Sequence, residues 1–164
     1  MINFGDINGI TIPEGEVAKI TSGSTVLWKK PASVTNFADP TSSDWWVDSR
    51  VGSDGLRRDA NGYHVTNYIG PLEEGDIVKV SGMDFVNIPK QSAPYKSDKT
   101  MHNSYGNSYM VNYVGLCISD ATITDKGCEF TNTKSAVKYW KFTGKLNGTV
   151  NDVIVNVKRG GVWL

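Results

Sequence analysis

Tyrosine and tryptophan side chains beside short polar residues are the part of this sequence whose chemistry points most directly to a function. Residues 89–109 read PKQSAPYKSDKTMHNSYGNSY, a polar and aperiodic stretch rich in Ser, Asn and Tyr. Aromatic rings offer apolar contact to the C–H faces of sugars, and amides and hydroxyls suit their polar rims. The same mixture also suits protein recognition, because Tyr brings contact area at a low entropic cost. We predict a ligand-binding surface that contains Trp45, Trp46, Tyr95, His102, Asn103, Tyr105 and Tyr109.

The orientation of these rings depends on the strands around them. Trp45 and Trp46 are adjacent, so in a strand one ring points to the core and the other points outward. A long irregular stretch such as 89–109 is usually functional or disordered. For Tyr95, Tyr105 and Tyr109, burial in the sheet core is an equal alternative to an outward position. We expect a second set of rings to lie in the core, namely Trp28, Tyr63, Trp140 and Phe142.

Catalytic and metal-binding motifs are missing from the sequence. The carboxylates Glu73, Glu74 and Asp76 stand in a PLEEGD turn before a strand, which favours a solvated turn over a glycosidase pair. The aspartates could supply oxygen ligands as Asp39, Asp44 and Asp48 or as Asp48, Asp54 and Asp59, but neither spacing matches a calcium loop. The two cysteines and two histidines do not have the spacing of a zinc site. The two cysteines, Cys117 and Cys128, are predicted to be reduced thiols. We therefore predict no enzymatic activity, no metal and no cofactor, and we interpret His64 and His102 as surface or edge residues.

The charge balance and the chain's hydropathy exclude several classes of partner. Seventeen basic residues stand against seventeen acidic residues in 164, so the formal net charge is zero. A neutral chain generates no long-range field that attracts nucleic acid or an anionic membrane. No run of 18 apolar residues is present, which argues against a membrane-spanning helix. The first residues, MINFGD, lack the basic and apolar regions of a secretory signal, so we expect synthesis in a cytoplasm.

Short β-branched and aromatic runs, bounded by Gly, Asn, Asp and Pro, predict an all-β protein. Within residues 152–158, every second residue is a valine. This alternation places Val153, Val155 and Val157 on one face of a strand and Ile154, Asn156 and Lys158 on the other. Turn signals recur at an interval typical of a sandwich. The predicted strands lie within 63–69, 76–80, 110–119, 137–143 and 152–158. We predict a jelly-roll-like antiparallel β-sandwich with a small N-terminal β module.

A boundary is expected near the sequence KKPAS at residues 29–33. Residues 1–30 read as a small β module that is too short to bury a core alone, so it should lean on another domain, a second copy or a larger assembly. Residues 31–44 are predicted to be a linker and residues 45–164 to form the jelly-roll sandwich. No fixed internal period is visible, which disfavours a propeller or a solenoid.

Two stretches resemble segments of virion proteins from tailed bacteriophages. Residues 7–20, INGITIPEGEVAKI, followed by TVLWK at 25–29, resemble a short module that opens or links tail, baseplate and head-surface proteins of phages and prophages of Gram-positive hosts. Residues 62–82, from GYHVTNYIG to DIVKVSG, resemble a hairpin of phage jelly-roll domains that look like carbohydrate-binding modules. Together the two stretches cover about a third of the chain, and neither carries a binding residue over from the family.

The resemblance implies a non-enzymatic protein of the virion surface, in a receptor-binding role at the tail or baseplate or in a head-decoration role. Its partners would be other virion proteins, further copies of itself, with a trimer favoured, and host surface polysaccharide. The N-terminal module would supply the anchoring residues Ile10, Ile12, Val17, Ile20, Val26 and Trp28. Two alternatives stay open: a free carbohydrate-binding module of a bacterial surface protein, and a sandwich enzyme such as a polysaccharide lyase, for which no acid–base pair can be nominated.

Overall fold

The computed structural model describes residues 19–22, 25–29, 34–86, 92–102 and 118–164. The chain divides into two compact units, residues 1–33 and residues 34–164. Antiparallel strands dominate the described residues, in which one short 3-10 helix is the helical element, and this confirms the predicted all-β class. Within the described residues no helix has both the length and the apolar character needed to cross a membrane.

The first unit contains one antiparallel hairpin. Strand β1 (Lys19–Ser22) pairs with strand β2 (Thr25–Lys29), and the register sets Ile20 opposite Trp28. An irregularity after Ile20 shifts the register, so that Thr21 faces Val26. This hairpin agrees with the small β module that the sequence predicts for residues 1–30, of which the other residues lie outside the described ones.

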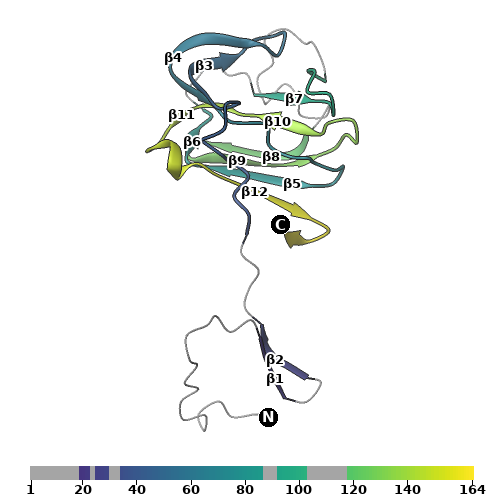
Figure 1. The fold of residues 1–164 in the computed structure, drawn as a ribbon. Coiled ribbons are helices and arrows are strands. Elements are labelled where there is room, and N and C mark those ends of the chain that lie inside the picture. Colours follow the sequence, from purple (N-terminus) through teal and green to yellow (C-terminus); the bar gives the residue numbers. More distant parts are fainter. Residues whose placement is uncertain (1–18, 23–24, 30–33, 87–91, 103–117) are drawn as a thin grey trace. The chain divides into compact units, whose positions relative to one another are not determined.

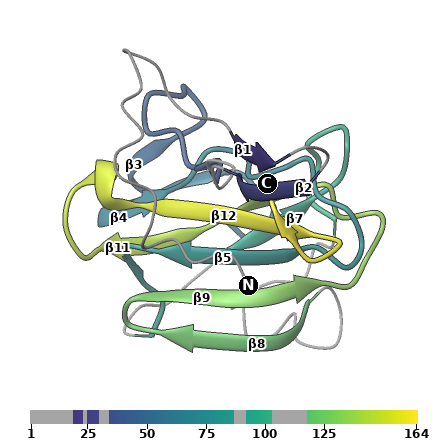
Figure 2. The same cartoon turned by 90° about the horizontal axis from the view of Figure 1, so that it is seen from below.

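The second unit holds two larger antiparallel sheets in a sandwich-like arrangement (Figures 1 and 2). The four-stranded sheet has the order β3 (Trp46–Val51), β4 (Arg57–Val65), β11 (Thr143–Leu146) and β6 (Met83–Asp84). The five-stranded sheet has the order β13 (Val162–Trp163), β12 (Ile154–Arg159), β5 (Ile77–Ser81), β9 (Gly127–Asn132) and β8 (Ile118–Thr124). A separate pair joins β7 (Ala93–Tyr95) to β10 (Tyr139–Lys141), and one short 3-10 helix, η3 (Val150–Asp152), precedes β12.

The main core lies on the inner face of the five-stranded sheet. Val155 and Val157 of β12 are completely buried and Val153 is 1% exposed, whereas their neighbour Ile154 is 44% exposed. The predicted alternation of the valines is therefore confirmed, and its cause is the two-residue period of a strand with one buried face. The aromatic side chains Phe130, Trp140 and Phe142 fill the space over these valines, together with the other buried residues of the same cluster.

Residues 34–44 belong to the sandwich and not to a linker. The Thr35 amide donates to the carbonyl of Leu164 at 2.6 Å, and the Phe37 amide donates to the carbonyl of Val155 at 2.8 Å. The Asn36 side chain adds two bonds to the β12 segment, donating to the Val153 carbonyl at 3.1 Å and accepting from the Val155 amide at 2.8 Å. The linker prediction is wrong for these residues because they satisfy the free edge of β12.

Strand β7 lies inside the stretch that the sequence marks as one long loop. Ala93, Pro94 and Tyr95 pair antiparallel with β10, in a register that sets Tyr95 opposite Tyr139. Pro94 is tolerated because it lies on a short edge strand, where a missing backbone donor costs little. The loop prediction is therefore wrong at residues 93–95, while the remainder of that stretch beyond His102 lies outside the described residues.

Cys128 is a free cysteine on the inner face of β9, and it is 5% exposed. Burial in apolar surroundings disfavours the thiolate and raises the pKa of the Cys128 thiol well above its usual range. A free Cys128 thiol agrees with the prediction that this cysteine is reduced. The other cysteine, Cys117, lies outside the described residues.

Candidate functional site

The two adjacent tryptophans have different surroundings. Trp45 is 7% exposed and belongs to the main core. Trp46 opens β3, is only partly buried, and packs against a second, smaller cluster formed by Val51, Val65 and residues of β7. The prediction is confirmed for Trp45, which lies in the core, whereas Trp46, the ring predicted to point outward, packs partly buried against the second cluster. Of the pair, Trp46 is the ring that can meet a ligand.

Tyr95 is a core residue, and its prediction as an outward ring is wrong. Its side chain is 2% exposed, and its hydroxyl donates a hydrogen bond to the Gly55 carbonyl at 2.9 Å. The Tyr68 ring meets it edge-on with a centroid distance of 5.0 Å, and Tyr139 meets Tyr68 at 6.0 Å. Because β7 pairs with β10, the buried Tyr95 belongs to the cluster against which these two partly buried rings pack.

A buried lysine contacts two of the partly buried rings. Lys141 of β10 is 0% exposed, and its Nζ lies 3.8 Å from the centroid of Trp46 and 4.5 Å from that of Tyr68. The same ammonium donates a hydrogen bond to the backbone carbonyl of Asp44. Cation–π contacts of this kind gain strength when water is excluded. The lysine therefore fixes the position of Trp46 relative to Tyr68.

A second lysine lies at the exposed rim. The Nζ of Lys99 is 4.7 Å from the centroid of Tyr68 and 3.5 Å from Oδ2 of Asp44. Both side chains of this ion pair are partly open to solvent, at 51% and 41% exposure. We call Asp44, Trp46, Tyr68, Lys99, Tyr139 and Lys141 the aromatic–lysine cluster. It combines partly buried rings with a charged, solvent-exposed edge.

This arrangement has the composition of a ligand-binding surface. The partly buried rings supply apolar contact area, and Lys99 and Asp44 supply a donor and an acceptor at the edge. A small number of polar groups around aromatic surface is the usual composition of a small-molecule or glycan site. Among the residues that the structure describes, no group of three or more His, Cys, Asp or Glu side chains could hold a metal ion.

The other predicted ligand-binding residues are only partly placed. His102 is partly buried directly after the β7 segment, and its backbone amide donates to the Pro94 carbonyl at 2.9 Å. It therefore lies next to the strand that carries Tyr95. Asn103, Tyr105 and Tyr109 lie outside the described residues, so their membership of the site stays a prediction.

The predicted anchoring residues are placed in the same partial way. Ile20 belongs to β1, and Val26 and Trp28 belong to β2, where only the backbone is described. Ile10, Ile12 and Val17 lie outside the described residues. The anchoring role of all six residues stays a prediction.

Most of the aromatic–lysine cluster was missed by reasoning from the sequence. Tyr68, Tyr139, Lys99 and Lys141 lie far from Trp46 in the chain, and strand pairing alone brings them together. One signal was available: Lys141 stands between Trp140 and Phe142 in a strand predicted to be buried. A lysine at such a position needs a partner for its charge, since burial of an unpaired ammonium is costly.

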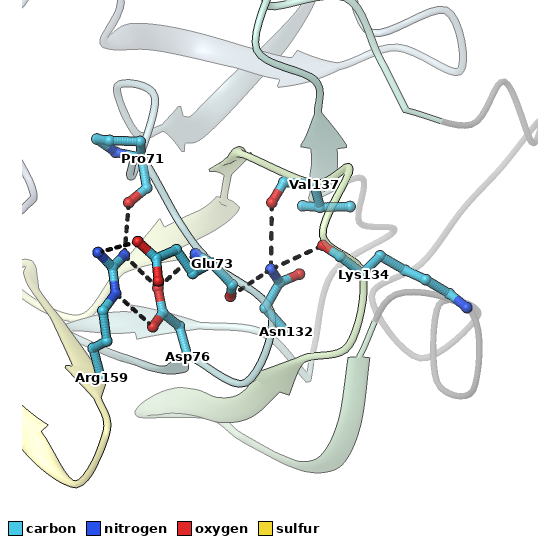
Figure 3. A network of polar contacts seen from close by, with 7 residues as sticks. All are labelled: Pro71, Glu73, Asp76, Asn132, Lys134, Val137 and Arg159. Atoms are coloured by element: carbon cyan, nitrogen blue, oxygen red, sulfur yellow. Dashed lines mark hydrogen bonds and ion pairs between the residues drawn. The ribbon is translucent and has the colours of Figure 1, made fainter.

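The carboxylates near residue 76 lie in a turn before β5, but the prediction that the turn is solvated is wrong for Asp76, which is buried against Arg159 and forms a structural joint. Asp76 is 1% exposed and accepts hydrogen bonds from Arg159 at 3.0 and 2.8 Å and from the Glu73 amide at 2.7 Å. Figure 3 shows the Arg159 guanidinium between Asp76, Glu73 and the Pro71 carbonyl, with the Glu73 ion pair at 2.8 Å. The hydrogen bonds that Arg159 donates to Asp76 raise the pKa of the Arg159 guanidinium.

Asn132 extends this joint into the core. Its Nδ2 donates to the carbonyl of Glu73 at 3.0 Å and to those of Lys134 and Val137 at 3.3 Å (Figure 3). The backbone amide of Asn132 also donates to the Asp76 carbonyl at 2.8 Å. Because the acidic and amide groups are used to hold turns together, the joint has a structural role.

An open hollow of about 330 Å³ lies over β5, β9 and the end of β8. Hydroxyl and charged side chains line it, and Lys79 and Glu129 approach each other across it at 3.6 Å. Its lining contains no aromatic ring, and both charged groups are about half exposed. The aromatic–lysine cluster is therefore the stronger candidate for ligand binding.

The burial of Lys141 is expected to make the free energy of unfolding depend on pH. Burial lowers the pKa of Lys141 from 10.5 to about 8, with Lys99 adding to the effect and Asp44 opposing it. Between these two values the unfolded chain keeps a proton that the folded chain has lost, so the free energy of unfolding should rise with pH across this window. Urea unfolding from about pH 8 to about pH 10 measures this slope. The slope should be smaller in the Lys141→Met variant, and equal slopes in the two proteins would contradict the prediction.

No protein-family model matches this chain, and neither a curated protein nor a solved structure matches it.

Proposed function

We propose that this chain is a non-enzymatic surface protein of a tailed-phage virion, anchored through residues 1–30, whose sandwich binds host surface glycan at the aromatic–lysine cluster. The virion part of the proposal is supported by the two resembling sequence stretches. The glycan part is supported by one observation above all, the partly exposed Trp46 ring held by a buried lysine. A role in receptor binding at the tail is favoured over head decoration, because decoration requires no such ring.

The physical basis of glycan binding is a ring that is already held in place. Trp46 is packed by Lys141 on one side and against Val51 and Val65 below. A ring that is fixed before binding loses little conformational freedom when a sugar contacts its exposed part. Lys99 and Asp44 at the edge are exposed enough to exchange their ion pair for hydrogen bonds to sugar hydroxyls. Exposed ion pairs of this type are worth about 0–1 kcal/mol, so the exchange is inexpensive.

Substitution of Trp46 tests the proposal. The Trp46→Ala variant should lose at least about tenfold in affinity for host cell-wall polysaccharide, since removal of an anchoring tryptophan commonly costs about 2 kcal/mol or more. Trp163→Ala is the matched control, because this partly buried tryptophan lies on edge strand β13, away from the cluster. Isothermal titration with purified chain measures affinity, and phage adsorption measures the consequence on the particle.

The possible results separate the two parts of the proposal. Unchanged polysaccharide affinity in Trp46→Ala would contradict the glycan site. Immunogold labelling of virions with antibody against residues 34–164 tests the virion location independently, and gold at the tail tip is the expected result. Virions without label, together with a monomeric chain that still binds polysaccharide, would instead favour a free carbohydrate-binding module.

A further inference from the structure

The hairpin of β3 and β4 lies at one end of the sandwich (Figure 1). An irregularity in its pairing exposes the dipeptide Asn61–Gly62. Val47 pairs with His64 and Ser49 pairs with Asp59, so the single residue Asp48 stands opposite residues 60–63 of β4. This bulge contains Asn61 and Gly62, and both are exposed to solvent. Gly62 has φ +76°, and no heavy atom lies within 4 Å of the position that a Cβ would occupy. Water therefore reaches the dipeptide freely.

Asp48 is aimed at the reactive nitrogen of this dipeptide. Its Oδ1 accepts a hydrogen bond from the backbone amide of Gly62 at 2.8 Å. Asp48 itself adopts φ +48°, a conformation that Asp and Asn tolerate better than most residues. A carboxylate at this distance meets the geometric requirement for a general base toward the proton of that amide.

We propose that Asn61–Gly62 is a site of spontaneous deamidation in the folded protein, with Asp48 as the general base. As Asp48 takes the amide proton of Gly62, the freed nitrogen bonds to Cγ of Asn61. The bond from Cγ to Nδ2 then breaks, and Nδ2 takes up a proton and leaves as ammonia. One water molecule opens the resulting five-membered imide at either carbonyl. The product at position 61 is aspartate or isoaspartate, with no oxidant or reductant involved.

The chain contains an internal comparison for this reaction. Asn-Gly pairs occur at residues 8–9, 61–62 and 147–148, and the last of these is also exposed. There, however, Nδ2 of Asn147 donates to the Asp125 carbonyl at 2.8 Å, and the Asn147 amide donates to the Gly82 carbonyl at 3.0 Å. These bonds hold the Asn147 side chain in place, whereas Asn61 makes no side-chain hydrogen bond within the described part of the chain.

Conversion at position 61 has an electrostatic and a geometric consequence. It adds a negative charge to the bulge that already carries Asp48 opposite it and Asp59 at its edge. Isoaspartate also lengthens the backbone by one carbon, which alters the register of a hairpin that begins with Trp46. Preparations of the protein should therefore separate with time into forms that differ by one charge.

Peptide mapping by mass spectrometry tests the proposal on the full chain. After incubation of the folded protein at neutral pH and 37 °C, conversion of Asn61 to the two acidic products should be faster than conversion of Asn147. The Asp48→Asn variant keeps an acceptor and tolerates the same backbone but removes the base. Its rate at Asn61 should fall at least about tenfold, within what a positioned base commonly supplies, while the rate at Asn147 stays unchanged.

Three results would overturn the proposal: an Asn61 that stays intact, a rate at Asn61 no higher than at Asn147, or an Asp48→Asn variant that converts at the wild-type rate. If that variant does not fold, the wild-type chain unfolded in guanidinium chloride takes its place as the reference. Because unfolding separates Asp48 from Gly62, the ratio of the two rates should then fall toward one. A ratio that persists in the unfolded chain also contradicts a role for Asp48.

Discussion

Replacement of Trp140 by alanine is expected to lower the free energy of unfolding of the sandwich by about 3–5 kcal/mol. Trp140 is completely buried, stacks on Phe142 with a centroid distance of 5.9 Å, and meets Phe130 edge-on at 5.2 Å. Its backbone also pairs with Ile69 outside the main strands. Removal of the indole leaves a cavity beneath both rings, which neighbouring strands can close only in part. Urea unfolding followed by circular dichroism measures the loss.

The matched control for this substitution is Trp163→Ala. Trp163 lies on the two-residue edge strand β13, is only partly buried, and makes a cation–π contact with Lys158 at 5.6 Å. We expect a loss of about 1 kcal/mol or less, since surface substitutions rarely cost more. A Trp140→Ala variant no less stable than this control would show that the core has collapsed around the vacant space.

Replacement of Asp76 by alanine is expected to cost about 3 kcal/mol, the lower part of the range for breaking a buried charge pair. The lower value applies because the Arg159 side chain is 34% exposed and can recover part of its hydration, while Asp76 is only 1% exposed. The change also removes the acceptor of the Glu73 amide, which holds the turn before β5. Thermal and urea unfolding at neutral pH measure the effect.

Glu73→Gln provides the control for Asp76→Ala. Glu73 binds the same guanidinium at 2.8 Å, but its side chain is 61% exposed. Exposed ion pairs contribute about 0–1 kcal/mol and weaken further with added salt. If the two variants lose the same free energy of unfolding, the burial of Asp76 adds nothing to its ion pair with Arg159. That result would contradict the prediction.

Local pattern was sufficient to predict much of the fold. The valines of β12 and the rings of Trp140 and Phe142 were assigned correctly to the core, because strand periodicity depends only on neighbours in sequence. Jelly-roll connectivity stays a prediction, since an order of strands depends on pairings across the whole chain.

The errors share one physical cause, which is pairing between distant segments. Residues 34–44 look like a linker, yet the edge of β12 supplies the hydrogen bonds that hold them. Residues 93–95 look like loop, yet β10 makes them a strand and thereby buries Tyr95. Of the residues in the aromatic–lysine cluster, only Trp46 was predicted from the sequence as ligand-binding. Tyr68, Lys99 and Lys141 join it only because β3, β7 and β10 meet at one end of the sandwich.

The hydrogen bond between Thr35 and Leu164 has a consequence for engineering. It brings the first and last segments of the unit 34–164 side by side, so the two ends of the unit lie close together. Domains with adjacent ends tolerate insertion into the surface loop of another protein. Residues 34–164 could thus be spliced as a cassette into a carrier, with a pair of short spacers, for display on a chosen scaffold.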